Sequence, residues 1–152
     1  MLRDPELYRY VPHLPPTTVA SLEARYRRTA AGPDGDTERW WNWAVLRAAD
    51  GAAMGTVETT LLASEDRALL AYAFGTAYWG FGYAFEACSA AIAHLRDTTA
   101  IRHVAAFVDT RNAHSTALLE RLGFERKETV ENADYFKGLP SNEYRYWLAL
   151  LR

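Results

Sequence analysis

The chain has 152 residues, of which 49% are hydrophobic and 24% are charged, with a net charge of −2. These values suit one globular domain spanning residues 1–152 and exclude wholesale disorder. The slight acidic excess argues against a nucleic-acid-binding protein, which needs a basic surface. A single cysteine, Cys88, excludes an internal disulfide or a Cys-based zinc site, and no histidine spacing predicts a metal. Without a signal-peptide pattern or membrane span, we expect a cytoplasmic protein.

The first half of the chain predicts one helix followed by three strands. Thr17 or Thr18 can cap a helix whose apolar positions Val19, Leu22 and Tyr26 have helical spacing. The three segments that follow are rich in apolar and aromatic residues and are separated by turn residues, which indicates a meander of strands: Trp40–Leu46, Met54–Leu62 and Arg67–Phe74. On the second of these strands, alternate residues predict one buried and one polar face.

The second half alternates helices and strands. A glycine-containing loop over Gly75–Tyr83 precedes the remaining elements, which we expect to be a helix, a strand buried on both faces, a short helix and two strands: Ala84–Arg96, Ile101–Val108, Ala113–Leu122, Phe124–Val130 and Tyr144–Leu151. Between the last two strands, Glu131–Glu143 reads as a polar loop bordering a substrate pocket. This order predicts an α/β fold, a mixed sheet with helices on its faces.

Gly80 and Gly82 lie between a buried strand and a helix. Glycine allows a tight turn and close approach of a ligand, and the first turn of a helix offers unpaired N–H groups. Together they predict a site for phosphate or pyrophosphate. The alternative is an ordinary strand–helix turn that binds nothing.

Asn112 and Ser115 lie at the start of the next helix, at the end of a buried strand. Both side chains can point toward the carboxyl ends of the central strands, where open sheets bind ligands. The alternative is that Asn112 only caps the helix and Ser115 only faces solvent.

Two segments of the chain resemble motifs of the GNAT superfamily of acyl-CoA-dependent N-acyltransferases. They are residues 78–84 (Tyr-Trp-Gly-Phe-Gly-Tyr-Ala) and residues 112–124 (Asn-Ala-His-Ser-Thr-Ala-Leu-Leu-Glu-Arg-Leu-Gly-Phe). The resemblance is to its Rim-type branch, which acetylates N-terminal amines of ribosomal proteins, and it extends over nearly the whole chain. The sequence departs from the family pattern at Trp79, where Gln or Arg is usual, and at Phe81, where Lys or Arg is frequent.

The resemblance implies roles for particular residues. Acetyl-CoA would be the cosubstrate, with its pyrophosphate held by backbone N–H groups of the loop residues Trp79, Gly80, Phe81, Gly82, Tyr83 and Ala84. The segment from Tyr72 to Phe74 would splay from its neighbouring strand and pair with the pantetheine arm, and a backbone N–H there would polarise the thioester carbonyl. Asn112 would hydrogen-bond the pantetheine, and Ser115 would protonate the departing thiolate directly or through a water.

The general base is less well defined. Glu58 is the best candidate, because it lies in mid-strand beside the expected cleft and burial would raise the pKa of a carboxyl group there. The alternative is that Glu58 faces water; Tyr72 and Tyr135 are weaker candidates. Trp40, Trp41 and Trp43 are expected to belong to the core, or else to form an acceptor-binding wall or an interface.

Two functions follow as hypotheses. The first is acetyl transfer from acetyl-CoA to a primary amine, on a protein N-terminus or a small molecule, and the second is a non-catalytic acyl-CoA-binding module. The family's first strand has no counterpart here, so we expect either Met1–Arg9 or the second subunit of a homodimer to cover the exposed edge of Trp40–Leu46. A monomer with that edge bare would contradict this expectation.

Overall fold

The computed structural model describes residues 4–151. Within them lies one six-stranded sheet with the order β1-β2-β3-β4-β6-β5. Its strands are β1 (Arg39–Leu46), β2 (Ala53–Leu62), β3 (Arg67–Phe74), β4 (His103–Asp109), β5 (Glu125–Phe136) and β6 (Leu139–Ala149). Only β3 and β4 pair in parallel, so the predicted mixed sheet is confirmed.

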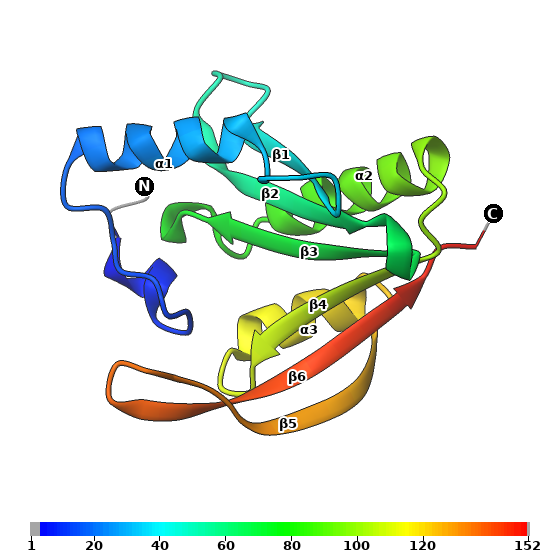
Figure 1. Ribbon diagram of the computed structural model, residues 1–152. Coiled ribbons are helices and arrows are strands. Elements are labelled where there is room, and N and C mark those ends of the chain that lie inside the picture. Colours follow the sequence, from blue (N-terminus) through cyan, green and yellow to red (C-terminus); the bar gives the residue numbers. More distant parts are fainter. Residues whose placement is uncertain (1–3, 152) are drawn as a thin grey trace.

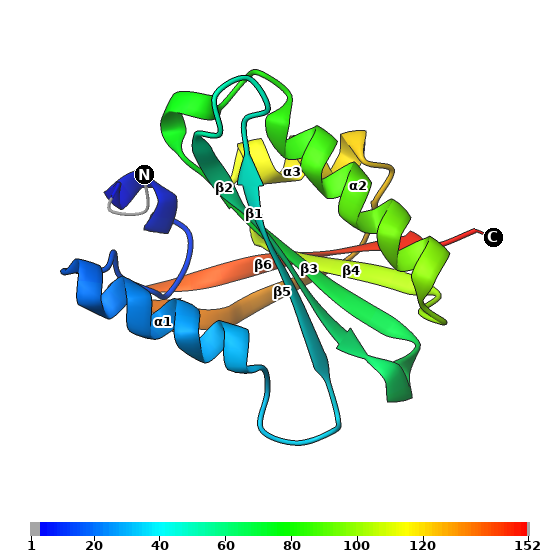
Figure 2. The same ribbon diagram turned by 90° about the horizontal axis from the view of Figure 1, so that it is seen from above.

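Helices cover both faces of this sheet. Helices α2 (Tyr83–Thr98) and α3 (Ala113–Arg121) lie on one face, and α1 (Val19–Ala31) lies across the other (Figures 1 and 2). The predicted cap of α1 is confirmed: the side chain of Thr18 accepts a hydrogen bond from the N–H of Ser21, 3.0 Å away.

The hydrophobic core fills the space between the sheet and the pair α2 and α3. Val57, Thr59 and Leu61 of β2 are buried there, while the residues between them point to the α1 face and are half-buried. On β4, Phe107 also points to the α1 face and is 42% exposed. The prediction that this strand is buried on both faces is therefore wrong, because α1 covers only part of its face.

The prediction of a polar loop over residues 131–143 is also wrong. Strands β5 and β6 continue through it and meet at a two-residue turn, Lys137–Gly138, where both residues have positive φ, 53° and 78°. Such a turn matches the twist of a hairpin. The hairpin lies at the edge of the sheet and its side chains are largely exposed, so main-chain pairing forms it without an apolar alternation.

Strand β1 forms the other edge of the sheet within residues 4–151. Residues 4–8 do not cover it. The short helix η1 (Pro5–Tyr8) is held between the end of β3 and the tip of the β5–β6 hairpin, because Asp4 accepts a hydrogen bond from Thr76 (2.6 Å) and Lys137 donates to the Tyr8 carbonyl. The expectation that Met1–Arg9 covers β1 is thus wrong for the described part of this segment. Residues 1–3 lie outside the described residues. Coverage of β1 by a second subunit stays a prediction.

Candidate acyl-transfer site

Strands β3 and β4 separate soon after they begin to pair. Their register covers Arg67–Leu69 of β3 and His103–Ala105 of β4. Beyond it, β3 runs on to Phe74 and β4 to Asp109 without further pairing between them, and Figure 1 shows the two strands diverging. The splay that the resemblance implied is therefore present in the sheet.

The backbone of β3 presents hydrogen-bonding groups to this gap. The N–H of Gly75 donates to the Met54 carbonyl of β2, 2.9 Å away. Because successive residues of a strand direct their N–H groups to opposite sides, those of Tyr72 and Phe74 point away from β2, toward β4. The Phe74 carbonyl accepts a hydrogen bond from the Trp79 indole at 2.7 Å, which ties the glycine loop to the end of β3.

The glycine loop leads directly into α2. Gly80 and Gly82 have φ values of +81° and +85°, which bulky residues rarely adopt. Gly82 is the N-cap of α2, and its carbonyl accepts the first helical hydrogen bond, from the N–H of Glu86 at 3.0 Å. The N–H groups of residues 83–85 have no partner within the helix, as at any helix N-terminus, and their role as a cradle for an anion stays a prediction.

The start of α3 joins the same region. Asn112 Oδ1 accepts a hydrogen bond from the N–H of Ser115 at 3.1 Å, so Asn112 caps the helix. The Tyr72 hydroxyl donates to the Ser115 carbonyl at 3.4 Å, which ties β3 to α3. Burial raises the pKa of Tyr72, and this tyrosine therefore keeps its proton and is a poor general base.

His114 is a further residue of this region, for which the sequence predicted no role. Its ring lies 5.4 Å from the Trp79 ring, so it connects the glycine loop with α3. Each of the two sequence motifs contains one of these residues, and only the fold brings the segments, 35 residues apart, into contact. Trp79 thus occupies the usual Gln or Arg position as a structural link between the loop, β3 and α3.

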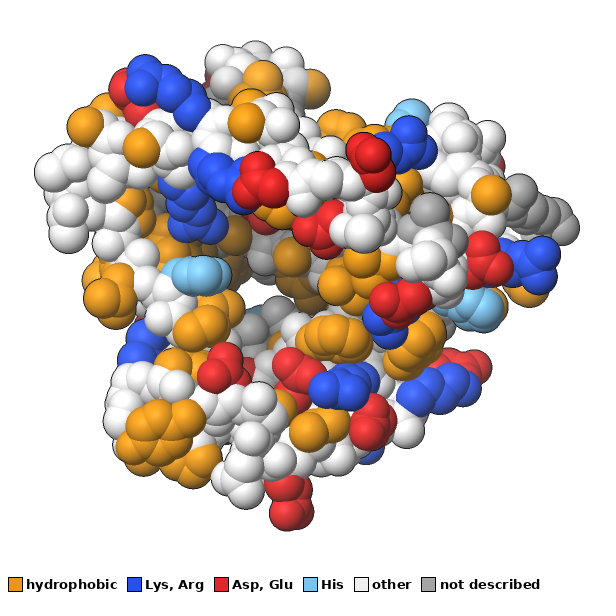
Figure 3. All heavy atoms as spheres, viewed as in Figure 1, with side chains coloured by type: hydrophobic (Ala, Val, Ile, Leu, Met, Phe, Trp, Pro, Cys, Tyr) orange, Lys and Arg blue, Asp and Glu red, His pale blue; other side chains and the backbone are white. Residues whose placement is uncertain are grey.

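A pocket of about 540 Å³ lies on the α1 face of the sheet. Figure 3 shows this face hollowed between α1 and the β5–β6 hairpin. Its lining contains the carboxylates of Glu38 and Glu58 and no Lys, Arg or His; the full lining is Thr29, Glu38, Trp40, Asn42, Glu58, Thr60, Leu69, Leu70, Ala71, Ala105 and Phe107. Glu58 is half-buried and accepts a hydrogen bond from Thr56 at 3.4 Å, so it faces a recess of the protein surface.

The three tryptophans of β1 divide between the two faces of the sheet. Trp40 lines this pocket, whereas Trp41 and Trp43 pack against the core and the His94 ring, with ring centres 5.2 and 6.0 Å from it. The core prediction is confirmed for the latter two. The alternative, a wall of a pocket, describes Trp40.

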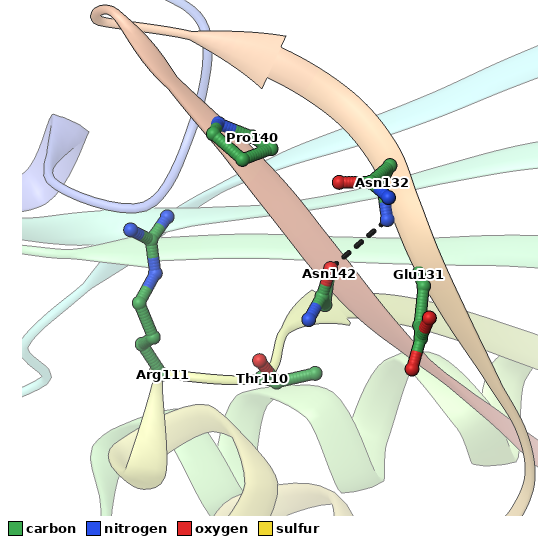
Figure 4. Close-up of a pocket in the computed structure, with 6 residues that line it drawn as sticks. All are labelled: Thr110, Arg111, Glu131, Asn132, Pro140 and Asn142. Carbon is green, nitrogen blue, oxygen red and sulfur yellow. Dashed lines mark hydrogen bonds between the residues drawn. The ribbon is translucent and has the colours of Figure 1, made fainter.

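A second pocket, of about 430 Å³, lies at the carboxyl end of β4 (Figure 4). Thr110 and Arg111 line it together with four residues of the hairpin, Glu131, Asn132, Pro140 and Asn142. The N–H of Asn132 donates to Asn142 Oδ1 across the hairpin at 2.9 Å. Asp134 lies on the same hairpin and accepts a hydrogen bond from the N–H of Tyr135 at 2.7 Å.

Asp109 anchors the segment between β4 and α3. Its side chain is 2% exposed and accepts hydrogen bonds from the Arg111 guanidinium at 2.6 and 2.8 Å, from the Arg111 N–H at 2.8 Å and from Ser141 at 2.6 Å. Burial alone would raise the pKa of Asp109, but these hydrogen bonds lower it to about 2. The carboxylate thus fixes the turn that delivers Asn112 to the site.

This depressed pKa predicts an acid sensitivity. Asp109 contributes about 2 kcal/mol to folding at neutral pH, and this stabilisation is lost as pH falls from about 4 through about 2. Urea unfolding measured across this range is expected to show a flatter pH dependence for Asp109→Asn than for the wild type. Asp34→Asn, at a 96% exposed carboxylate, is the control and should leave the profile unchanged. Parallel profiles for Asp109→Asn and wild type would contradict the assignment.

Residues 1–125 match the family model described as the acetyltransferase (GNAT) domain, so the chain belongs to the GNAT family of acetyltransferases. It is an acetyl-CoA-dependent N-acetyltransferase by family, and its mixed sheet has the fold of that family. No protein of curated function matches it in sequence. No helix within residues 4–151 is long and apolar enough to span a membrane.

Solved structures show the same fold. Spermidine N-acetyltransferase from Vibrio cholerae, in complex with CoA and spermine, is 17% identical with a TM-score of 0.80, over 97% of this chain and 85% of that one. A GNAT-family acetyltransferase from Bacillus anthracis is 17% identical with a TM-score of 0.85, over 98% and 84%. A Vibrio cholerae protein assigned as a ribosomal-protein-serine acetyltransferase is 21% identical with a TM-score of 0.68, over 86% and 71%.

Proposed function

We propose that this chain acts as one domain that binds acetyl-CoA in the splay and acetylates a primary amine held on the α1 face of the sheet. The observation that carries the proposal is the position of the gap between β3 and β4, which opens next to the glycine loop and next to Glu58. Glu58 of β2 lies directly opposite Ala71 of β3 in the register. At Ala71, β3 has already separated from β4, because their pairing ends at Leu69.

On the CoA side, main-chain groups do most of the binding. The pyrophosphate lies on the N–H groups of residues 79–84, and the pantetheine arm runs along the backbone from Tyr72 to Phe74. Asn112 uses its carbonyl oxygen as a helix cap, so its amide nitrogen serves as the donor to the arm. The Tyr72 N–H then polarises the thioester carbonyl as negative charge develops on its oxygen.

On the acceptor side, the neutral amine attacks the thioester carbonyl carbon. The C–S bond breaks, the thiolate takes a proton from Ser115 or from a water held by it, and the proton of the amine passes to Glu58 directly or through water. Transfer is direct, without an acyl-enzyme. Cys88 agrees with this step, since it is fully buried and burial raises the pKa of its thiol to about 12.

Thioester consumption with a panel of primary amines tests the proposal. We expect turnover by the wild type and a kcat about 100-fold lower for Glu58→Gln, with CoA affinity unchanged. Glu23→Gln, at an exposed carboxylate of α1, is the control and should behave as the wild type.

Three outcomes would contradict parts of this proposal. CoA binding without any thioester consumption would favour the second candidate function, a non-catalytic acyl-CoA-binding module. Full activity of Glu58→Gln would leave water as the proton acceptor. The proposal also includes a cytoplasmic location and a homodimer in which a second copy covers β1; a monomer in solution would contradict the latter.

A further inference from the structure

We propose that the amine acceptor is an elongated aliphatic diamine or polyamine, which lies along the pocket on the α1 face with one amine at Glu58 and a second at Glu38. This inference rests on the proposed function and adds the substrate class to it. Its basis is the order in which polar and apolar side chains follow one another along β1, β2 and β3.

The lining residues form successive rows across the sheet. In the row beside the splay, Asn42 pairs with Glu58, which pairs with Ala71. In the next row, Trp40 pairs with Thr60, Thr60 with Leu69, and Leu69 with Ala105. The far end is formed by Glu38, just before β1, and by Thr29 of α1. The pocket therefore changes from acidic to mostly apolar and back to acidic.

The two carboxylates are separated by a distance that one small amine cannot span. Asn42 pairs with Glu58, and Glu38 comes four residues before Asn42. Because four residues of extended chain span about 13 Å, the backbone positions of the two glutamates are about that far apart along the strand direction. The flexible side chains shorten the gap between the carboxylates, yet the row with Trp40 and Leu69 still lies between them. A methylene chain suits that middle row, while an ammonium group suits each end.

Two arginines beside the pocket pair with other carboxylates. Arg28 stacks over the Trp40 ring at 5.4 Å and forms an ion pair with Asp34. Arg145 lies 5.2 Å from the Phe107 ring and pairs with Glu143 and Glu128. The pocket therefore keeps a negative charge that favours a dication over a singly charged amine.

The same lining disfavours a peptide N-terminus. A peptide laid along the pocket would place its several amide groups over Trp40, Thr60, Leu69 and Ala105, a row in which the Thr60 hydroxyl and the Trp40 indole are the side-chain polar groups. Buried amides without partners are costly, whereas methylene groups gain from burial there. The pocket thus favours an aliphatic chain over the protein N-terminus that the Rim-type resemblance suggested.

The test compares cadaverine with pentylamine, which has the same carbon chain but one amine. We expect the wild type to have a KM for cadaverine at least tenfold lower than that for pentylamine. Glu38→Gln should raise the KM for cadaverine about tenfold while leaving its kcat, the pentylamine constants and CoA affinity unchanged. Asp36→Asn, at an exposed carboxylate two residues away, is the control and should change none of them.

Equal KM values for the two amines, or an unaltered cadaverine KM in Glu38→Gln, would overturn the inference; continued acetylation of pentylamine would then show that the proposed function still holds. An N-terminal peptide with a higher kcat/KM than cadaverine would also overturn it. A lack of acetylation of all three acceptors, with CoA binding intact, would overturn the proposed function as well.

Discussion

Gly82→Val is expected to weaken CoA binding by about tenfold or more. Gly82 is the N-cap of α2 at φ +85° and ψ −1°, and a β-branched residue there costs about 1–3 kcal/mol. Space is not the cause, because an added Cβ meets nothing within 4 Å. The valine would shift the backbone away from this conformation, and the N–H groups of residues 83–85 would no longer converge on the pyrophosphate. Isothermal titration with CoA measures the effect.

Gly51→Val is the matched control for this prediction. Gly51 also has a positive φ, +71°, with open space around it, but it lies in the turn between β1 and β2. Both variants should lose comparable stability in urea unfolding, while only Gly82→Val should lose CoA affinity. Equal affinity losses in the two variants would mean that the loop acts through global stability, and the anion-cradle assignment would then be wrong.

Gly55→Ala is expected to destabilise the fold by about 2–3 kcal/mol and to weaken CoA binding at the same time. A Cβ at Gly55 would lie 2.3 Å from the Ala73 carbonyl oxygen and 2.8 Å from the Phe74 ring. The first contact is with main chain, so β2 and β3 must move apart to relieve it, which is a costly form of overpacking. Since Phe74 ends the strand that lines the gap between β3 and β4, the segment proposed to bind CoA moves with it.

Urea unfolding and CoA titration check both parts of this prediction. Ala53→Ser, two residues earlier on β2 at an exposed position, is the control and should stay within about 0.5 kcal/mol of the wild type. A Gly55→Ala protein that unfolds at the wild-type urea concentration would show that the close approach of Gly55 to Phe74 is not required.

The sequence predicted the elements whose signals are local. Spacing of apolar residues identified the helices, alternation on β2 predicted its two faces, and the glycines at 80 and 82 indicated a turn that the structure confirms with positive φ values. The β5–β6 hairpin was missed because an exposed edge hairpin needs no apolar pattern. Its turn residues, Lys137 and Gly138, were the available signal.

The candidate site could be predicted only in part, because its parts meet across strands. Asn112, Ser115 and the glycine loop belong to motifs that are continuous in sequence. Glu38 precedes β1 in a segment without any motif, and it becomes part of a pocket only through the register of β1 with β2 and β3. Asp109 ends a strand whose sequence is nearly all apolar, and its partner Ser141 comes from β6, 32 residues later.

The separation of β3 from β4 also gives the sheet an aperture. In the proposed arrangement, the cosubstrate reaches this aperture from the end where the glycine loop and the start of α3 meet, while the pocket with Glu58 opens on the α1 face. Two reactants can thus meet at one carbonyl carbon without competing for the same surface, and neither has to leave before the other arrives. Such an arrangement makes a covalent acyl-enzyme intermediate unnecessary. The only cysteine of the chain, Cys88, is buried in the core on the face of β3 opposite to the pocket.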